Sequence, residues 1–241
     1  MVLLRQTWLL LQTDLRQELR TLELVLTAGF FSLVLLALVG LAFTGTAFTQ
    51  AQDSIALSWL WLSIAFVGVL TLTRLFDGER EADTLRALLV APIHRLAIFL
   101  AKIATSFLVL SLCSIVLVPG LALFFAPARV FLTRPFATAV LLSLGIFGYV
   151  VVGTFFAAGL ATSRGKNVFI SLILLPLTTP VLMYNLLATR ALLVHHPSFT
   201  TYLWRLAALD LIVFAVCAWL FEVVLVGHPT SHARAYSSTK A

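Results

Sequence analysis

The sequence predicts an all-α integral membrane protein with six transmembrane helices, and two observations carry this prediction. Hydrophobic residues make up 61% of the 241 residues and charged residues only 11%, whereas a soluble domain is about 45–50% apolar and about 25% charged. Apolar runs of roughly 20 residues, the length needed to cross a bilayer, recur along the chain. The six runs cover residues 24–43, 55–74, 98–118, 136–161, 168–189 and 206–226. We expect one membrane domain over residues 1–227 and a disordered tail over residues 228–241, which is rich in Ser, Thr and His.

The segment before the first run, residues 3–22, has the pattern of an amphipathic helix. Leucines and one tryptophan recur at spacings of three and four, with polar and basic residues largely between them: Trp8, Leu11, Leu15, Leu19 and Leu22 against Arg5, Gln12, Arg16, Gln17 and Arg20. A helix of this kind lies in the membrane interface. We therefore predict an N-terminal interfacial helix, with an extended first spanning helix as the alternative.

The distribution of basic residues predicts the orientation in the membrane. Of the 16 Lys and Arg residues, four fall in alternate loops, at Arg129, Arg134, Arg190 and Arg205, and all the others fall on the opposite side. Cytoplasmic loops carry the excess of Lys and Arg, so both termini are predicted to be cytoplasmic. The net charge of +6 then indicates contact with anionic membrane lipid and not with nucleic acid.

The loop that follows the second run is the most informative stretch. Acidic residues come first, leucines follow on one helical face, and a proline ends the segment: Asp77, Glu79, Glu81 and Asp83, then Leu85, Leu88 and Leu89, then Pro92. This pattern predicts a short amphipathic helix on the cytoplasmic surface. Such a helix either docks on a soluble partner through its leucines or simply connects two spans.

Two prolines lie inside the fifth run, at Pro176 and Pro180. Each removes a backbone hydrogen bond and bends a helix, and Thr178 and Thr179 can return hydrogen bonds to freed carbonyls. We interpret this stretch either as a flexible helix that lines a translocation region or as a static kink.

Other residues within the apolar runs have simpler interpretations. Asp210 and Glu222 lie in or near the last run; an intramembrane carboxylate is a functional-site hypothesis by default, but we expect both to reach the interface or to be paired. Cys113 and Cys217 lack the spacing of a zinc site or a disulfide framework.

Aromatic and small residues add two weaker signals. Trp59 and Trp61 stand near the start of a predicted helix and fit an interfacial aromatic belt, with stacking on haem as the alternative. Gly145 and Gly148 permit close helix packing without forming a strict GxxxG series.

The sequence does not predict an enzyme. It has no G-x-x-x-x-G-K-[ST] phosphate-binding loop. It also shows no arrangement of Ser, His and Asp, of paired carboxylates or of metal ligands. The absence of a phosphate-binding loop supports a permease role.

Two stretches resemble one family. The stretch from Arg74 through the acidic residues 77–83 to the leucines 84–89, with Ala91, Pro92 and Lys102, is similar to the first cytoplasmic loop of the haem exporter protein B (CcmB) family of cytochrome c maturation. The stretch 174–182 resembles the proline-paired fifth helix of that family. The resemblance extends over residues 3–226.

The resemblance implies an ABC-2-type permease with no enzymatic activity of its own, in a bacterial or organellar inner membrane. ATP would be bound by a separate ATPase subunit, haem would be a possible substrate, and no cofactor would be covalently bound. Implied partners are that ATPase, a haem-handling membrane subunit, a periplasmic haem chaperone and a second copy of this chain. The coupling helix against the ATPase would comprise Asp77, Gly78, Glu79, Arg80, Glu81, Asp83, Thr84, Leu85, Leu88 and Leu89.

His195 and His196 lie in the last loop predicted to face outward. Because histidine is a common axial ligand of haem, contact with haem is one hypothesis, and an exposed loop histidine without a ligand is the other.

Three alternative functions compete with haem export. The first is an ABC-2-type permease for another amphiphile, such as a lipid or a drug. The second is a membrane scaffold that transports nothing and has no ATPase partner. The third, a secondary transporter, predicts charged pairs near the midplane and inverted repeats, and we find neither in the sequence.

Overall fold

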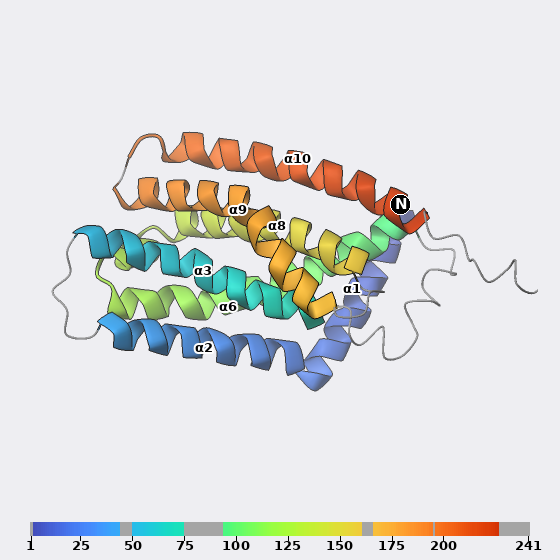
Figure 1. Cartoon of the computed structure of the whole chain (residues 1–241), viewed down its shortest axis with the longest axis horizontal. Helices are drawn as coiled ribbons and strands as arrows, with labels where there is room; N and C mark the ends of the chain where they lie inside the picture. The colour runs from blue at the N-terminus through green and yellow to red at the C-terminus, as the bar shows by residue number, and fades with distance from the viewer. Residues whose placement is uncertain (1, 44–49, 75–93, 161–165, 195, 227–241) are drawn as a thin grey trace, which may run out of the picture.

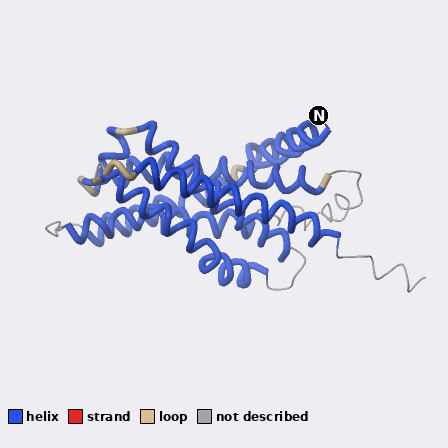
Figure 2. Tube along the Cα trace, turned by 90° about the horizontal axis from the view of Figure 1, so that it is seen from above, coloured by secondary structure: helices blue, strands red, loops and turns tan. Residues whose placement is uncertain are grey.

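The structure is a computed structural model that describes residues 2–43, 50–74, 94–160, 166–194 and 196–226. Within these ranges the ordered elements are all helices, without a strand (Figure 2). The elements are α1 (Val2–Thr21), α2 (Glu23–Phe43), α3 (Gln50–Arg74), α6 (Arg95–Phe124), η1 (Pro127–Arg129), α7 (Val130–Thr133), α8 (Pro135–Leu160), α9 (Lys166–Leu193) and α10 (Phe199–Val226). All six predicted apolar runs fall largely within these helices.

The long helices form a bundle, and α1 lies across one end of it (Figure 1). Helices α2, α3, α6, α8 and α10 run along the long axis of the molecule, α9 is bent so that only its second part does, and the six helices alternate in direction. The end of α3, the beginning of α6 and the end of α10 lie near α1, and we call this the α1 end. The short elements η1 and α7 and the connection from α9 to α10 lie at the other end, which we call the far end.

Four helices of the described part are long and apolar enough to cross a membrane. The candidate spans are Val25–Ala42, Arg95–Phe124, Pro135–Ala158 and Phe199–Phe221, and α3 contributes a shorter apolar stretch, Ser58–Arg74. The protein is therefore a multi-pass membrane protein with an all-helical fold. The last helix begins at Phe199, seven residues before the predicted run at 206, because residues such as Thr200 and Thr201 continue a helix although they are not apolar.

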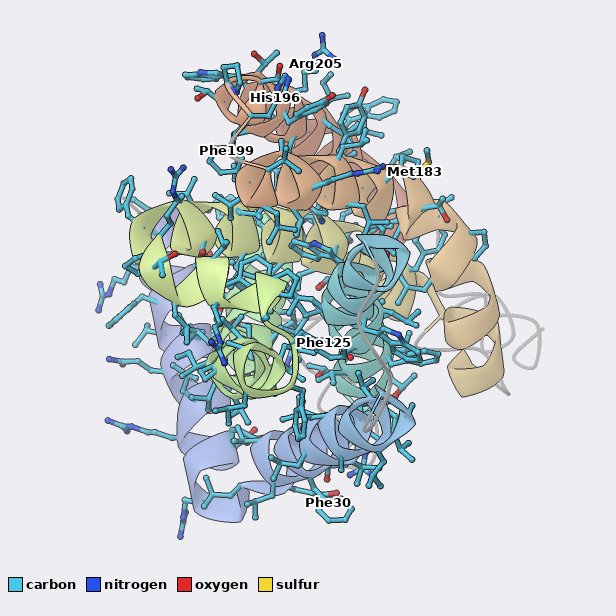
Figure 3. All side chains as sticks on the ribbon, turned by 90° about the vertical axis from the view of Figure 1, so that its left-hand side faces the viewer. Phe30, Phe125, Met183, His196, Phe199 and Arg205 are labelled. Atoms are coloured by element: carbon cyan, nitrogen blue, oxygen red, sulfur yellow. The ribbon has the colours of Figure 1, made fainter. Side chains whose placement is uncertain are left out.

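The outer surface of the bundle is apolar, as lipid contact requires. In Figure 3, Phe125 lies between the helices whereas Phe30 and Met183 lie at the periphery. Phe125 is fully buried, and Phe30 is 70% exposed. Exposed large apolar side chains occur on α2, α6 and α10, among them Leu26, Leu33, Leu38, Leu41, Leu108, Leu112, Ile115, Leu211, Ile212, Val216 and Trp219. A soluble protein rarely exposes large apolar side chains over wide areas of its surface.

The centre of the bundle is built around α3 and α8. The Tyr149 hydroxyl donates a hydrogen bond of 2.7 Å to the carbonyl oxygen of Ala65. The ring of Tyr149 lies directly against Gly68, where a Cβ atom would overlap it. The glycine therefore allows α3 and α8 to approach closely, and the phenol satisfies its polar group inside the bundle.

The predicted N-terminal amphipathic helix is confirmed as α1, separate from α2. The chain turns at Leu22, whose φ of 52° lies in the left-handed region. The Glu18 side chain then accepts a hydrogen bond of 2.8 Å from the backbone N–H of Val25, which satisfies a free donor at the start of α2. On the exposed side of α1, Leu4 and Trp8 lie among basic residues, which is the mixed surface expected of an interfacial helix.

Candidate functional site

The segment predicted to couple to an ATPase, residues 75–93, lies outside the described residues. This includes all ten predicted coupling residues: Asp77, Gly78, Glu79, Arg80, Glu81, Asp83, Thr84, Leu85, Leu88 and Leu89. The structure does describe the residues on either side of the segment, and both are bound to the N-terminal helices.

Before the segment, Arg74 is the last residue of α3. Its Nη1 atom lies 2.9 Å from Oε1 of Glu23, at the start of α2, and 3.5 Å from the hydroxyl of Thr27. The Arg74 and Glu23 side chains are 42% and 70% exposed. An exposed ion pair of this kind is weak, so this contact positions the end of α3 without fixing it rigidly.

After the segment, His94 takes an extended conformation just before α6 begins. The backbone N–H of His94 donates a hydrogen bond of 3.2 Å to Oε1 of Gln6, on α1. The two residues that flank segment 75–93, Arg74 and His94, therefore contact two different N-terminal helices, α2 and α1.

A buried ion pair fixes α1 to α6 two turns farther along. The Lys102 Nζ atom lies 3.0 Å from Oδ2 of Asp14, and the two side chains are 7% and 15% exposed. The Thr105 hydroxyl lies 3.5 Å from the same carboxylate oxygen and 3.1 Å from the carbonyl oxygen of Ala101. The sequence indicated only that Lys102 lies near the first cytoplasmic loop, and its pairing with Asp14 was not predicted. Among the described residues these two side chains form the buried charge contact between the interfacial helix and the bundle.

Helices α3 and α6 each contact one of the last two helices deeper in the bundle. The indole Nε1 of Trp61, on α3, donates a hydrogen bond of 2.7 Å to the hydroxyl of Thr189, on α9. The rings of Phe99, on α6, and Phe221, on α10, stack with their centroids 4.6 Å apart. The two helices that flank segment 75–93 therefore contact α9 and α10 directly.

Trp61 corrects a sequence prediction. It is 2% exposed and hydrogen-bonded inside the bundle, so its assignment to an interfacial aromatic belt is wrong. Helix α3 begins at Gln50, which places Trp61 11 residues, or about 16 Å, from that end.

The two prolines and two threonines of α9 divide between its surfaces. Pro176, Thr179 and Pro180 are exposed, whereas Thr178 is fully buried. The Thr178 hydroxyl donates a hydrogen bond of 2.9 Å to the carbonyl oxygen of Leu174. This carbonyl is not one of those that the prolines deprive of a donor, which belong to residues 172 and 176. A translocation region along this stretch stays a prediction.

His196 lies in the tight connection between α9 and α10, near Arg205 at the far end (Figure 3). It is exposed, and its Nδ1 atom accepts a hydrogen bond of 3.2 Å from the backbone N–H of Ser198. Nε2 is then the ring nitrogen left to face a ligand. His195 lies outside the described residues, so contact of either histidine with haem stays a prediction.

A layer of polar side chains crosses the bundle between α3, α8, α9 and α10, and we call Trp61, Asn185, Thr189 and Asp210 the polar layer. The Thr189 hydroxyl donates a hydrogen bond of 2.7 Å to the carbonyl oxygen of Asn185. Asn185 is fully buried and Asp210 is 2% exposed. Neither carboxylate oxygen of Asp210 and neither amide atom of Asn185 has a hydrogen-bond partner within the described structure.

Asp210 also corrects a prediction, because it neither reaches the interface nor is paired with a described residue. It is the central residue of the candidate span Phe199–Phe221. The earlier start of α10 explains the difference, since a helix that began at 206 would place this residue near its end. For Glu222, the other predicted carboxylate, the side chain lies outside the described part.

Comparison with known proteins assigns the family. The model of the CcmB protein family matches residues 5–225. The chain belongs to the CcmB family. A search of curated proteins finds no match.

Membership in the CcmB family shows the coarse function, a membrane subunit of haem export for cytochrome c maturation. The match extends from α1 to the last turn of α10 and includes segment 75–93. It therefore takes in both the contacts at the α1 end and the polar layer.

Proposed function

We propose that this CcmB chain is the permease subunit of an ABC-type complex, and that segment 75–93 receives the work of a separate ATPase. The observation that carries the proposal is the attachment of both ends of this segment, Arg74 to Glu23 and His94 to Gln6. A segment that transmits force needs to move the helices on either side of it.

In this proposal α2, α3, α6, α8, α9 and α10 all span the membrane. The excess of Lys and Arg favours an orientation in which the α1 end, with both termini, lies on the cytoplasmic side of the inner membrane, where ATP is available. The acidic residues 77–83 and the leucines Leu85, Leu88 and Leu89 form a coupling helix that docks on the ATPase. Such a helix offers apolar anchors within a charged rim.

Displacement of the coupling helix acts first on α3 and α6, which begin or end beside it. The Asp14–Lys102 pair makes α1 move with α6, so the interfacial helix and the bundle respond together. The contacts of Trp61 with Thr189 and of Phe99 with Phe221 then carry the displacement to α9 and α10. The chain itself hydrolyses nothing; it converts nucleotide-driven movement of the partner into rearrangement of the bundle.

The complex handles haem, either as a translocated substrate or as the group released to a haem chaperone through a haem-handling membrane subunit. Two copies of the chain form its membrane core, because ABC-type ATPases act in pairs and each pair has two sites for coupling helices. Haem contacts at the far end, including His195 and His196, belong to this proposal.

Rescue of cytochrome c maturation tests the proposal. The gene is expressed in a bacterial strain that lacks its own CcmB subunit, and covalent haem in c-type cytochromes is measured at matched membrane levels of the chain. The native chain restores maturation, and the triple variant Leu85→Asp, Leu88→Asp, Leu89→Asp does not. The matched control replaces Ser237, Ser238 and Thr239 of the tail by Asp, outside the region matched by the family model. We expect this control to restore maturation as the native chain does.

The same experiment separates the competing functions. Failure of the native chain to rescue, although it is inserted normally and binds the ATPase of the host, contradicts haem export and favours a permease for another amphiphile. Equal rescue by the triple variant and the native chain contradicts the role given to segment 75–93.

A further inference from the structure

The polar layer contains the carboxylate of Asp210 and the amide of Asn185, and neither group has a hydrogen-bond partner among the described residues. A Cβ atom on Gly145 would lie 2.6 Å from both Nδ2 and Oδ1 of Asn185, and a Cβ atom on Gly148 would overlap Oδ1 of Asp210. The two glycines are one turn apart on α8. Asn185 and Asp210 are therefore packed against neighbouring positions of the same glycine face, from α9 and α10.

This arrangement is costly unless something else compensates the carboxylate. An isolated ionised carboxylate cannot be held in an apolar interior without a partner, and in practice such a group binds a proton or a cation. An unsatisfied buried amide adds about 1–3 kcal/mol. Both groups lie about 12–16 Å along their helices from the far end, well away from either end of the bundle.

No charged side chain of the described structure is placed to compensate Asp210. The titratable and charged residues of the four helices α6, α8, α9 and α10 are Arg95, Lys102, Cys113, Tyr149, Lys166, Tyr184, Arg190, Tyr202, Arg205, Cys217 and Glu222. Lys102 is bound to Asp14, and the hydroxyl of Tyr149 is bound to Ala65. Arg190 and Arg205 are exposed toward the far end, and Arg95 and Lys166 are the first residues of α6 and α9.

We propose that Asp210 and Asn185 form a binding site for a single positive charge in the centre of the bundle, taken up either as a proton or as a sodium ion. The carboxylate supplies two oxygen atoms and the amide a third, a set of ligands that suits a hard cation or a hydrated proton. A single carboxylate matches a single charge, and the described residues contain no cluster of three or more metal-ligating side chains that would hold a transition metal. Binding neutralises the site and lets α8, α9 and α10 pack as observed.

Labelling with dicyclohexylcarbodiimide tests this site on the full chain in nanodiscs. This apolar reagent reacts with protonated carboxyl groups inside membranes, and mass spectrometry of peptides locates the adduct. At neutral pH and without sodium, Asp210 is labelled. Asp14 is the internal control, and we expect it to stay unlabelled because its carboxylate is bound to the Lys102 side chain.

Two further arms identify the bound charge. If the site takes a proton, labelling falls as the pH rises and is insensitive to sodium, and the infrared band of a protonated carboxyl group is lost in Asp210→Asn. If the site takes sodium, sodium chloride at constant pH protects Asp210 from labelling where choline chloride does not. Asn185→Ala shifts the midpoint of the pH or sodium dependence of Asp210 labelling. The control Thr13→Ala, at an exposed position, leaves that midpoint unchanged.

The proposal is overturned if the native chain shows neither labelling of Asp210 nor a protonated carboxyl band nor an effect of sodium. An infrared band that persists in Asp210→Asn overturns the proton form. Carbodiimide labelling and the infrared measurement on the native chain are informative even if the variants fail to fold. They are also independent of any ATPase, so failure here leaves the proposed function untouched.

Discussion

Replacement of Lys102 by Met removes the positive partner of the buried pair that fixes α1 to α6. Methionine has a similar length and keeps the apolar contacts of the lysine stem, so the main loss is the charge. Asp14 is left with a side chain that is only 15% exposed, and the Thr105 hydroxyl, 3.5 Å away, is a weak substitute. We expect Lys102→Met to destabilise the folded chain.

The size of the effect follows from the burial of the pair. Two charges 3.0 Å apart attract by about 5–6 kcal/mol at an effective dielectric constant of 20, and most of this offsets the cost of desolvation. Removal of one partner from a buried pair costs about 3–5 kcal/mol. Because water reaches part of Asp14, we expect the low end of that range, about 3 kcal/mol.

A double-mutant cycle measures this interaction. The native chain, Asp14→Asn, Lys102→Met and the double variant are unfolded by denaturant in one detergent. The double variant leaves no unpaired charge, so its loss should fall short of the sum of the single losses by about 1–3 kcal/mol. The control is the same cycle on Glu23→Gln and Arg74→Gln, whose exposed pair should show a coupling below about 1 kcal/mol.

Two results would refute the reasoning. Additive losses in the Asp14 and Lys102 cycle would mean that the two charges do not interact. A coupling in the exposed pair as large as in the buried pair would mean that burial does not set the strength of these contacts.

Three further predictions concern packing, backbone and hydrogen bonding, each read from unfolding in the same detergent. Gly148→Ala forces a Cβ atom into the polar layer and should lower the free energy of unfolding by about 1–3 kcal/mol. The control Gly29→Ala, with nothing within 4 Å of the new atom, should raise it by about 0.5–1 kcal/mol. Equal effects of the two substitutions would contradict the close approach of Asp210 to Gly148. Leu22→Gly should raise the free energy of unfolding by up to about 1 kcal/mol. Left-handed backbone costs an L-residue about 1–2 kcal/mol, and the extra freedom of glycine in the unfolded chain offsets part of the gain. A lower free energy of unfolding would speak against a left-handed residue at this position. Thr189→Val leaves the indole N–H of Trp61 unpaired inside the bundle and should cost about 1–3 kcal/mol, and a neutral result would show that this hydrogen bond does not form.

The sequence predicts best the features that depend on local pattern. Residues 3–22 alternate apolar and polar residues with helical period, and α1 forms there as a helix separate from α2. The apolar runs locate the long helices, and the paired prolines lie inside α9 as expected. These features depend on side chains within a few turns of one another, so a single segment carries the information.

The positions of helix ends are less predictable because hydropathy and helicity are different properties. Polar residues such as Thr200 and Thr201 are not counted in an apolar run but extend α10. That extension moves Asp210 from the end of a helix to the centre of a span. The same effect places Trp61 well inside α3.

Contacts between distant segments could not be predicted from one sequence. Trp61 and Thr189 are 128 residues apart, and Asp14 and Lys102 are 88 residues apart. A weak signal was available for the ion pair, since Lys102 interrupts the start of an otherwise apolar stretch and so needs a partner. Asn185 offered a similar signal within the fifth apolar run.

Site-specific crosslinking between segment 75–93 and the ATPase subunit tests the central claim most directly. A photoreactive residue is introduced at Leu85 or Leu88 in the complex in native membranes, and at Trp219 on the apolar surface of α10 as the control. We predict crosslinks to the ATPase from both leucine positions, with yields that change when ATP is replaced by ADP, and none from the control. Absence of any crosslink from both leucine positions, in a complex that retains its ATPase, would contradict transmission of force through this segment.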